Sequence, residues 1–171
     1  MPRLSPDDSA QRLIALACRV LDAPVGLLSL YGEDRTVFRT VHGLEIKDIR
    51  SEVSVTRMLI ELGPDGLIVI PDGRQDPRVQ GHPLVTGPMG LRFYAGTTVC
   101  DRTGRPVGSI GVMDQKARPG LDAAQTALLR DLARMAGDLI DRQADDRAAA
   151  KTAETLDMAE SMAGVGHWRL D

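Results

Sequence analysis

Aromatic residues are scarce in this chain of 171 residues, and its net charge is small. The aromatic residues are Tyr31, Phe38, Phe93, Tyr94 and Trp168. Proteins that bind single-stranded nucleic acid stack bases on aromatic side chains, and those that bind duplexes present a basic stripe. Here 21 basic residues stand against 24 acidic ones, for a net charge of -3, and no segment is strongly basic. These counts predict that nucleic acid is not a partner.

Cysteine is scarce too, and long apolar runs are absent. Cys18 and Cys100 form no CxxC pair and only three histidines accompany them, so no metal site is predicted. No apolar stretch reaches the roughly 18 residues that a membrane helix needs. The chain runs into Asp7 and Asp8 without the apolar core of a secretory signal. We therefore expect a cytoplasmic protein with reduced thiols and no membrane partner.

Catalytic motifs are missing from the sequence as well. It contains no paired carboxylates, no HExxH, no nucleophile elbow and no glycine-rich phosphate loop followed by a helix. Cys18 falls on the apolar side of a predicted helix, whereas Cys100 ends a predicted strand, and neither has an obvious resolving partner. We expect no disulfide between the two thiols, no catalytic residues and no enzyme activity of the chain's own.

The hydrophobic periodicity alternates between helix and strand. It predicts a helix over 8–21, a hairpin of strands over 25–31 and 36–41, a short helix within 51–62, a strand over 67–70, and a second hairpin of strands over 93–100 and 106–113. Apolar residues lie on both faces of the predicted strand Val25–Leu30, which is typical of a central strand covered on both sides. Ser109 and Gly111 leave one face of the last strand bare, so either a helix or a ligand can approach it closely.

A long helix is predicted from Leu121 onward. Four residues at four-three spacing form a stripe that we assign as a dimer seam, namely Leu128, Leu132, Met135 and Leu139. Past Ile140 the same positions are polar or small, as at Asp146 and Ala149, which is typical of an extended connector. Gly164 is expected to end the helix, and residues 167–171 to begin a strand.

Several motifs occur in the order found in a known family. They are Asp76-Pro-Arg, Pro83-Leu-Val-Thr-Gly87, Leu91-Arg-Phe-Tyr-Ala-Gly96, Gly104-Arg-Pro-Val-Gly-Ser-Ile-Gly-Val-Met-Asp114 and Leu129-Arg-Asp-Leu-Ala133. This run, over about residues 8–143, resembles bacterial GAF domains of signalling proteins, and residues 159–171 resemble the opening of a PAS domain. The resemblance implies an α+β fold, with a GAF-like central antiparallel sheet of about six strands flanked by helices and a long C-terminal helix. It also implies a division into a sensory domain (1–143), a helical connector (144–160) and a truncated PAS-like segment (161–171).

The sequence departs from the photosensory members of that family. These attach a linear tetrapyrrole through a cysteine, yet the segment 51–91 holds no cysteine and only His82. Covalent bilin is therefore not expected, and no cofactor is predicted beyond an unidentified small ligand. The residue set of cyclic-nucleotide-binding relatives is not evident either.

The candidate ligand-binding residues are Arg57, Arg92, Phe93, Tyr94 and Thr98. Arg92 can hold an anion through two hydrogen bonds while the neighbouring rings cover an apolar part, or it can pair with an aspartate. His82 is either a haem or metal ligand or a solvent-facing loop residue. Asp72 and Gly73 are first of all turn formers.

Three functions remain open. The first is a regulatory sensory input domain that binds a small ligand, dimerises and signals through its C-terminal helix to PAS and kinase or cyclase output domains in the same chain. The second is a dimeric transmission module with a vestigial pocket. The third is a thiol redox enzyme, because the resemblance includes free methionine sulfoxide reductases. A side-chain-filled interior would favour the second function, and facing cysteines the third.

Overall fold

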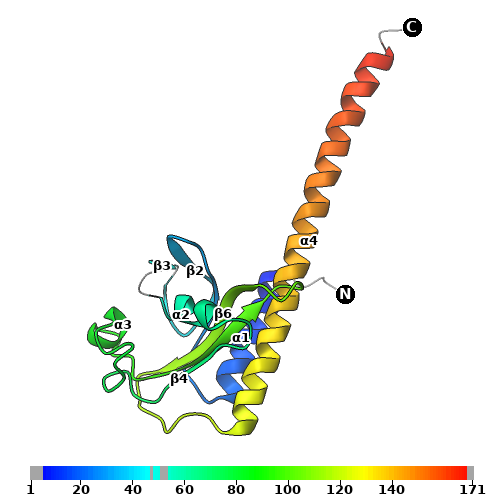
Figure 1. Cartoon of the computed structure of the whole chain (residues 1–171). Coiled ribbons are helices and arrows are strands. Elements are labelled where there is room, and N and C mark those ends of the chain that lie inside the picture. Colours follow the sequence, from blue (N-terminus) through cyan, green and yellow to red (C-terminus); the bar gives the residue numbers. More distant parts are fainter. Residues whose placement is uncertain (1–5, 47, 51–53, 169–171) are drawn as a thin grey trace. The chain divides into compact units, whose positions relative to one another are not determined.

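The computed structural model describes residues 6–46, 48–50 and 54–168. The chain forms two units, Met1–Leu139 and Ile140–Asp171. The first contains every strand and all of the helices except the later part of the last one (Figure 1). The domain boundary expected from the sequence lies a few residues later, after residue 143.

The elements follow one another in an α+β order. They are α1 (Pro6–Val20), β1 (Val25–Leu30), β2 (Arg35–His42), β3 (Asp48–Arg50), α2 (Val55–Leu62), β4 (Leu67–Ile70), α3 (Pro83–Thr86), β5 (Phe93–Cys100), β6 (Pro106–Asp114) and α4 (Ala123–Trp168). Both predicted hairpins are confirmed, since β1 pairs with β2 and β5 with β6, each antiparallel. The three residues of β3 and the four of α3 were not predicted, because such short elements carry no periodicity.

The strands form one antiparallel sheet in the order β3-β2-β1-β6-β5-β4. The short β3 extends an edge of a sheet whose body is the five longer strands. Strand β1 lies between β2 and β6, and its residues are almost all buried. The prediction of a central strand covered on both faces is therefore confirmed.

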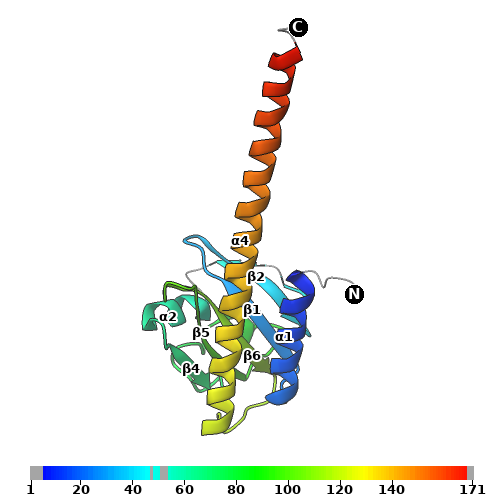
Figure 2. The same ribbon diagram turned by 90° about the vertical axis from the view of Figure 1, so that its right-hand side faces the viewer.

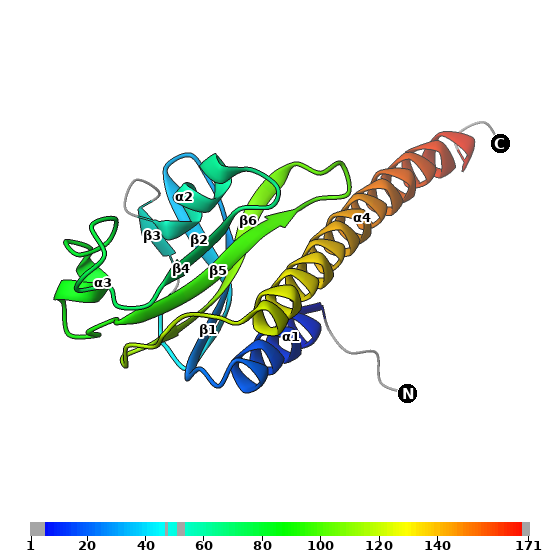
Figure 3. The same cartoon turned by 60° about the horizontal axis from the view of Figure 1, so that its bottom comes forward.

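Helices cover both faces of the sheet. Helix α1 and the part of α4 before Ile140 lie side by side on one face (Figure 2), and α2 lies on the other (Figure 3). Two glycines allow the close approach on the first face. A Cβ on Gly26 would lie 2.6 Å from the Sγ of Cys18 in α1, and a Cβ on Gly137 of α4 would lie 2.3 Å from the carbonyl oxygen of Cys100.

Capping residues set where two helices begin. The Ser54 hydroxyl accepts a hydrogen bond from the Thr56 N–H, so α2 starts at Val55, and residues 51–53 of the predicted helix lie outside the described residues. Before α4, Asp122 accepts from the Gln125 N–H and the Gln125 side chain accepts from the Asp122 N–H, at 2.8 and 3.0 Å. This reciprocal capping box starts α4 at Ala123 rather than at the predicted Leu121.

The second unit is the later part of α4. Its side chains are solvent-exposed from Ala144 to Ala163. The helix continues through Gly164 and Gly166 to Trp168, so the predicted helix end at Gly164 is wrong. The predicted strand from residue 167 is wrong as far as Trp168, and its residues 169–171 lie outside the described residues. A helical glycine costs only about 1 kcal/mol relative to alanine, which does not by itself end a growing helix. None of the helices in the part of the chain that the structure describes has the length and apolar character of a membrane span.

Candidate functional site

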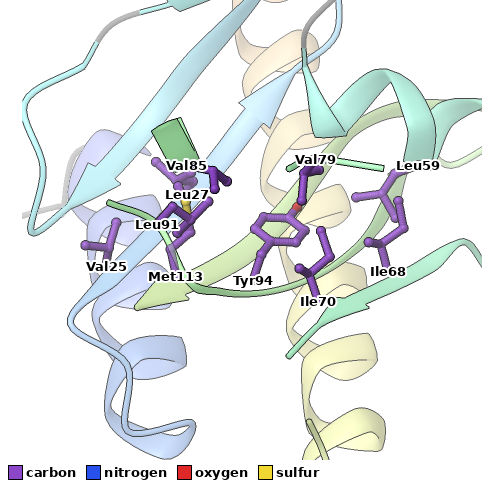
Figure 4. Close-up of a cluster of buried hydrophobic side chains, with 10 residues drawn as sticks. All are labelled: Val25, Leu27, Leu59, Ile68, Ile70, Val79, Val85, Leu91, Tyr94 and Met113. Carbon is purple, nitrogen blue, oxygen red and sulfur yellow. The ribbon is translucent and has the colours of Figure 1, made fainter. Parts of the chain in front are cut away.

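A small cavity lies between the sheet and the segments that cover its α2 face. Strand alternation places on one face the residues that form its floor, which are Leu27, Ser29, Tyr94, Ser109, Gly111 and Met113. Residues of α2 and of the segment 71–91 form its walls and roof. Figure 4 shows the buried apolar cluster around it, with the Tyr94 ring in the middle.

The cavity is nearly full. The space that the centres of water-sized molecules can occupy in it is about 40 Å³. One water needs roughly 10–15 Å³ on this measure, so the cavity holds about three waters. The described residues that line it carry no carboxylate, lysine or arginine. Such a cavity suits a small neutral group.

The Tyr94 ring fills the centre of this face because two glycines leave room for it. Gly96 and Gly111 are direct partners across β5 and β6, and added Cβ atoms there would lie 2.1 and 2.8 Å from the Tyr94 hydroxyl oxygen. That hydroxyl is hydrogen-bonded to the Ser109 side chain, and burial raises the pKa of Tyr94 strongly. The phenol is therefore neutral across the physiological range.

The hydrogen-bond chain continues into α2. The Ser109 and Thr56 hydroxyls lie 2.9 Å apart, and both residues are buried. The sequence predicted a bare strand face at Ser109 and Gly111 that a helix or a ligand could approach. In the structure α2 and the Tyr94 ring cover this face, and the cavity is the space that remains. The polar chain ties the sheet to α2 at the cavity wall.

The covering segment 71–91 is held down by Arg92. Its Nε and Nη2 donate to the two carboxylate oxygens of Asp72, each at 2.6 Å. The Gly73 N–H also donates to the Arg92 carbonyl at 2.5 Å, and the Arg92 N–H donates to the Asp114 carbonyl. The guanidinium beside it lowers the pKa of Asp72. Of the two predicted roles of Arg92, anion binding and pairing with an aspartate, the structure shows the pairing.

His82 caps the short helix α3 within this segment. Its Nδ1 accepts a hydrogen bond from the Leu84 N–H at 3.1 Å, so this nitrogen is engaged in the fold. Among the described residues, no group of three or more histidine, cysteine, aspartate or glutamate side chains is arranged to hold a metal ion. His82 lines the cavity and also an outer groove.

The outer groove runs between α2 and residues 77–83 at the surface. It offers about 520 Å³ to water-sized molecules and is lined by Ser54, Val55, Arg57, Met58, Glu61, Pro77, Arg78, Val79, Gly81, His82 and Pro83. Four of these residues, Ser54, Val55, Val79 and His82, also line the cavity. A single layer of side chains therefore separates groove and cavity.

Of the five candidate ligand residues, the structure places only Tyr94 at the cavity. Phe93 is buried on the opposite face, where the Arg118 guanidinium lies 5.1 Å from its ring centre. The Thr98 hydroxyl donates to the Leu59 carbonyl of α2 at 3.0 Å. Arg57 lies in the outer groove, with its Nε donating to Glu61. Lining residues such as Leu27 and Ser29 were not predicted, because the alternation within a strand does not show which face of the sheet the segment 71–91 covers.

The predicted dimer seam needs a correction at Leu132. This side chain is only 2% exposed because it packs inside the domain, together with Leu129, Ala133 and Ala136. By contrast, Met135 is 51% exposed, and Leu128 and Leu139 are half-buried. Four-three spacing marks a wide apolar stripe without telling which edge meets the sheet, and here Leu132 meets it.

Neither cysteine lies at the cavity. Cys18 is buried beside Gly26, and burial raises its pKa. Cys100 is half-buried, with its Sγ 3.7 Å from the Pro64 carbonyl oxygen. Burial, and then the carboxylates of Asp101 and Asp65, raise the pKa of Cys100. Both thiols are free and protonated at neutral pH, which is the opposite of what a thiolate nucleophile requires.

Comparison with known proteins gives relatives in sequence and in fold. A cyclic di-GMP phosphodiesterase of Pseudomonas aeruginosa is 31% identical over 129 residues, which is 75% of this chain. The chain spans only 22% of that relative's length. The similarity therefore concerns one part of a larger protein.

Solved structures share the fold at low sequence identity. The GAF domain of an Acinetobacter phosphoenolpyruvate-protein phosphotransferase superimposes with a TM-score of 0.68 at 14% identity, over 86% of this chain and 87% of that one. A free methionine-R-sulfoxide reductase of Neisseria meningitidis gives 0.63 at 16% identity, over 82% and 81%. The model of the GAF domain family matches residues 5–140, which is well over half of the chain. This chain therefore belongs to the GAF domain family.

Proposed function

We propose that this GAF domain is the regulatory sensory input of a multidomain signalling protein. It binds a small ligand in the cavity under α2 and passes the change through α4 to an output domain. The observation that carries the proposal is the position of the cavity, whose polar chain from Tyr94 through Ser109 to Thr56 joins the sheet to a covering helix. A ligand that displaces any of these hydrogen-bonded side chains changes how α2 packs on the sheet.

Dimerisation is the second part of the proposal. Helices α1 and α4 of the first unit lie side by side (Figure 2), and each has exposed apolar side chains. Leu16 and Val20 of α1 are 41% and 43% exposed, and Met135 of α4 is 51% exposed. A second copy covers these residues best, because the same patch on both copies satisfies two-fold symmetry. The seam now consists of Leu128, Met135 and Leu139, without Leu132.

We propose that these residues are one part of a longer signalling protein that also carries the output domain. The chain spans 22% of the relative from Pseudomonas aeruginosa, which supports a signalling protein that contains further domains besides the GAF domain. A PAS domain from about residue 161 and a kinase or cyclase output are the arrangement that we propose. Helix α4 is then the connector between input and output.

One specific observation favours a second candidate function. The cavity is so nearly filled by Tyr94 that it suits a vestigial pocket in a domain that only dimerises and transmits. The thiol redox enzyme gains no such support, because neither free cysteine lines the cavity. The domain shares only 16% sequence identity with the sulfoxide reductase, so that similarity concerns the fold alone.

Release of small molecules from the natively purified protein separates the two candidates. We expect denaturation to release a molecule in proportion to the protein, as measured by mass spectrometry, and its addition to raise the melting temperature. Protein that releases nothing and stays dimeric would instead support the vestigial-pocket module.

A further inference from the structure

The cavity and the outer groove together form a site with two chemically different halves. The cavity holds no charged side chain among its described lining residues, and its polar side chains other than Ser29 take part in hydrogen bonds within the domain. Ser54 caps α2, Thr56 bonds to Ser109, and His82 caps α3. A charged group inside it would lose its hydration without gaining a partner. The inner half therefore accepts only an apolar group.

The outer groove contains two arginines that differ in how firmly they are held. Arg78 donates twice to Asp76, at 3.0 and 2.6 Å, and once to the Val69 carbonyl, so its role is structural. The Arg57 side chain makes one hydrogen bond, from Nε to Glu61, and the two side chains are 47% and 63% exposed. The Nη groups of Arg57 have no hydrogen-bond partner within the part of the chain that the structure describes. An exposed pair of this kind is weak, so Arg57 is available to an incoming anion.

The two halves are close enough for one small molecule to reach both. Ser54, Val55, Val79 and His82 line both spaces, and Arg57 lies within one helical turn of Val55 in α2. The volume of about three waters, roughly 90 Å³ of liquid, limits the inner group to a few carbon atoms. A molecule with a short apolar tail and an anionic head matches both halves.

We propose that the site binds a short-chain carboxylate, with its tail of three or four carbons in the cavity and its carboxylate on Arg57. This proposal rests on the proposed sensory function, since it names the chemical class of the ligand. Ser54, Val55, Val79 and His82 form the passage between groove and cavity. Entry of the tail moves these side chains and brings it against Tyr94.

Calorimetric titration of the purified protein with acetate, butyrate and 1-propanol tests the proposal. Each buried methylene contributes about fourfold in affinity, so butyrate should bind about fifteenfold more tightly than acetate. 1-Propanol, which has the same three-carbon tail without the charge, should bind more weakly than butyrate. Arg57→Gln should lower butyrate affinity about fivefold and leave 1-propanol unaffected. The matched control is Arg134→Gln, an exposed arginine paired with Asp131 three residues earlier, which should change neither.

A second variant tests the passage. Val55→Trp adds bulk between groove and cavity and should abolish the advantage of butyrate over acetate, provided that its thermal unfolding remains cooperative. Equal binding of acetate and butyrate, or equal binding of butyrate to wild type and Arg57→Gln, would overturn the carboxylate assignment. If a different molecule is released from the natively purified protein and butyrate does not displace it, the assignment falls while the sensory function stands. If neither butyrate nor any released molecule binds, both fall.

Discussion

At the scale of single residues, the packing of Tyr94 depends on the absence of two Cβ atoms. A Cβ on Gly111 would lie 2.8 Å from the Tyr94 hydroxyl oxygen and 2.9 Å from the ring, which is closer than such atoms pack. Gly111→Ala should therefore displace the ring and destabilise the domain by about 1–3 kcal/mol in urea denaturation. Gly81→Ala is the control, because nothing lies within 4 Å of a Cβ there. Equal effects of the two substitutions would contradict this account of the Tyr94 site.

The pair of Arg92 with Asp72 makes a prediction about pH. Hydrogen bonds from Arg92 lower the pKa of Asp72 below its ordinary value of 3.8 in the folded protein. The unfolded chain therefore binds this proton more readily, so the pair stabilises the fold above about pH 4 and the stabilisation is lost as pH falls through the folded pKa. Asp72→Asn should lower the melting temperature at pH 7 and lose less on acidification than wild type does. Parallel curves of melting temperature against pH would contradict a stabilising role.

At the scale of elements, the two edges of α4 before Ile140 have opposite roles. Leu132 is buried in the domain, so Leu132→Asp places an unpaired charge in the core and should cost more than about 4 kcal/mol. Met135 is exposed, so Met135→Asp should change the free energy of unfolding by less than about 0.5 kcal/mol. In sedimentation equilibrium the Met135 variant should shift the protein to monomer. A wild type that is already monomeric would contradict the proposed seam.

The strand-level predictions succeeded where the residues within one element decide the outcome. Alternating and two-sided apolar patterns located β1, β2, β5 and β6, and the turn residues between them set antiparallel pairing. Element ends were less predictable. The start of α4 depends on the capping box of Asp122 and Gln125, and its extent past Gly164 depends on how little two glycines cost at the end of a long helix.

At the scale of the whole molecule, the proposed function requires α4 beyond Ile140 to pass the signal from the cavity to an output domain. The positions that continue the proposed seam there, Asp146, Ala149 and Ala153, are polar or small and exposed. Pairing of two such helices is weak, so small rotations cost about 1–2 kcal/mol, which is the usual range of allosteric coupling.

Replacement of these three residues by leucine should lock the paired helices. In the full-length parent, the locked variant should give an output activity that no longer depends on what occupies the cavity. Leucines at the neighbouring positions Arg147, Ala150 and Glu154 provide a control of equal hydrophobicity outside that register. A locked variant that responds to ligand as wild type does would contradict the connector role.

What the sequence determined by itself is the set of properties that neighbouring residues decide together. These include the order of the helices and strands other than β3 and α3, the two hairpins, the central position of β1 and the motifs that placed the chain in its family. What only the tertiary structure decided is which distant groups meet. Arg92 pairs with Asp72 twenty residues away, and Thr56 reaches Ser109 across fifty-three. Leu132 meets the core because the sheet takes one edge of an apolar stripe and leaves the other to solvent. Each partner is set by the register of the strands and the packing of helices on them, which short-range patterns do not encode.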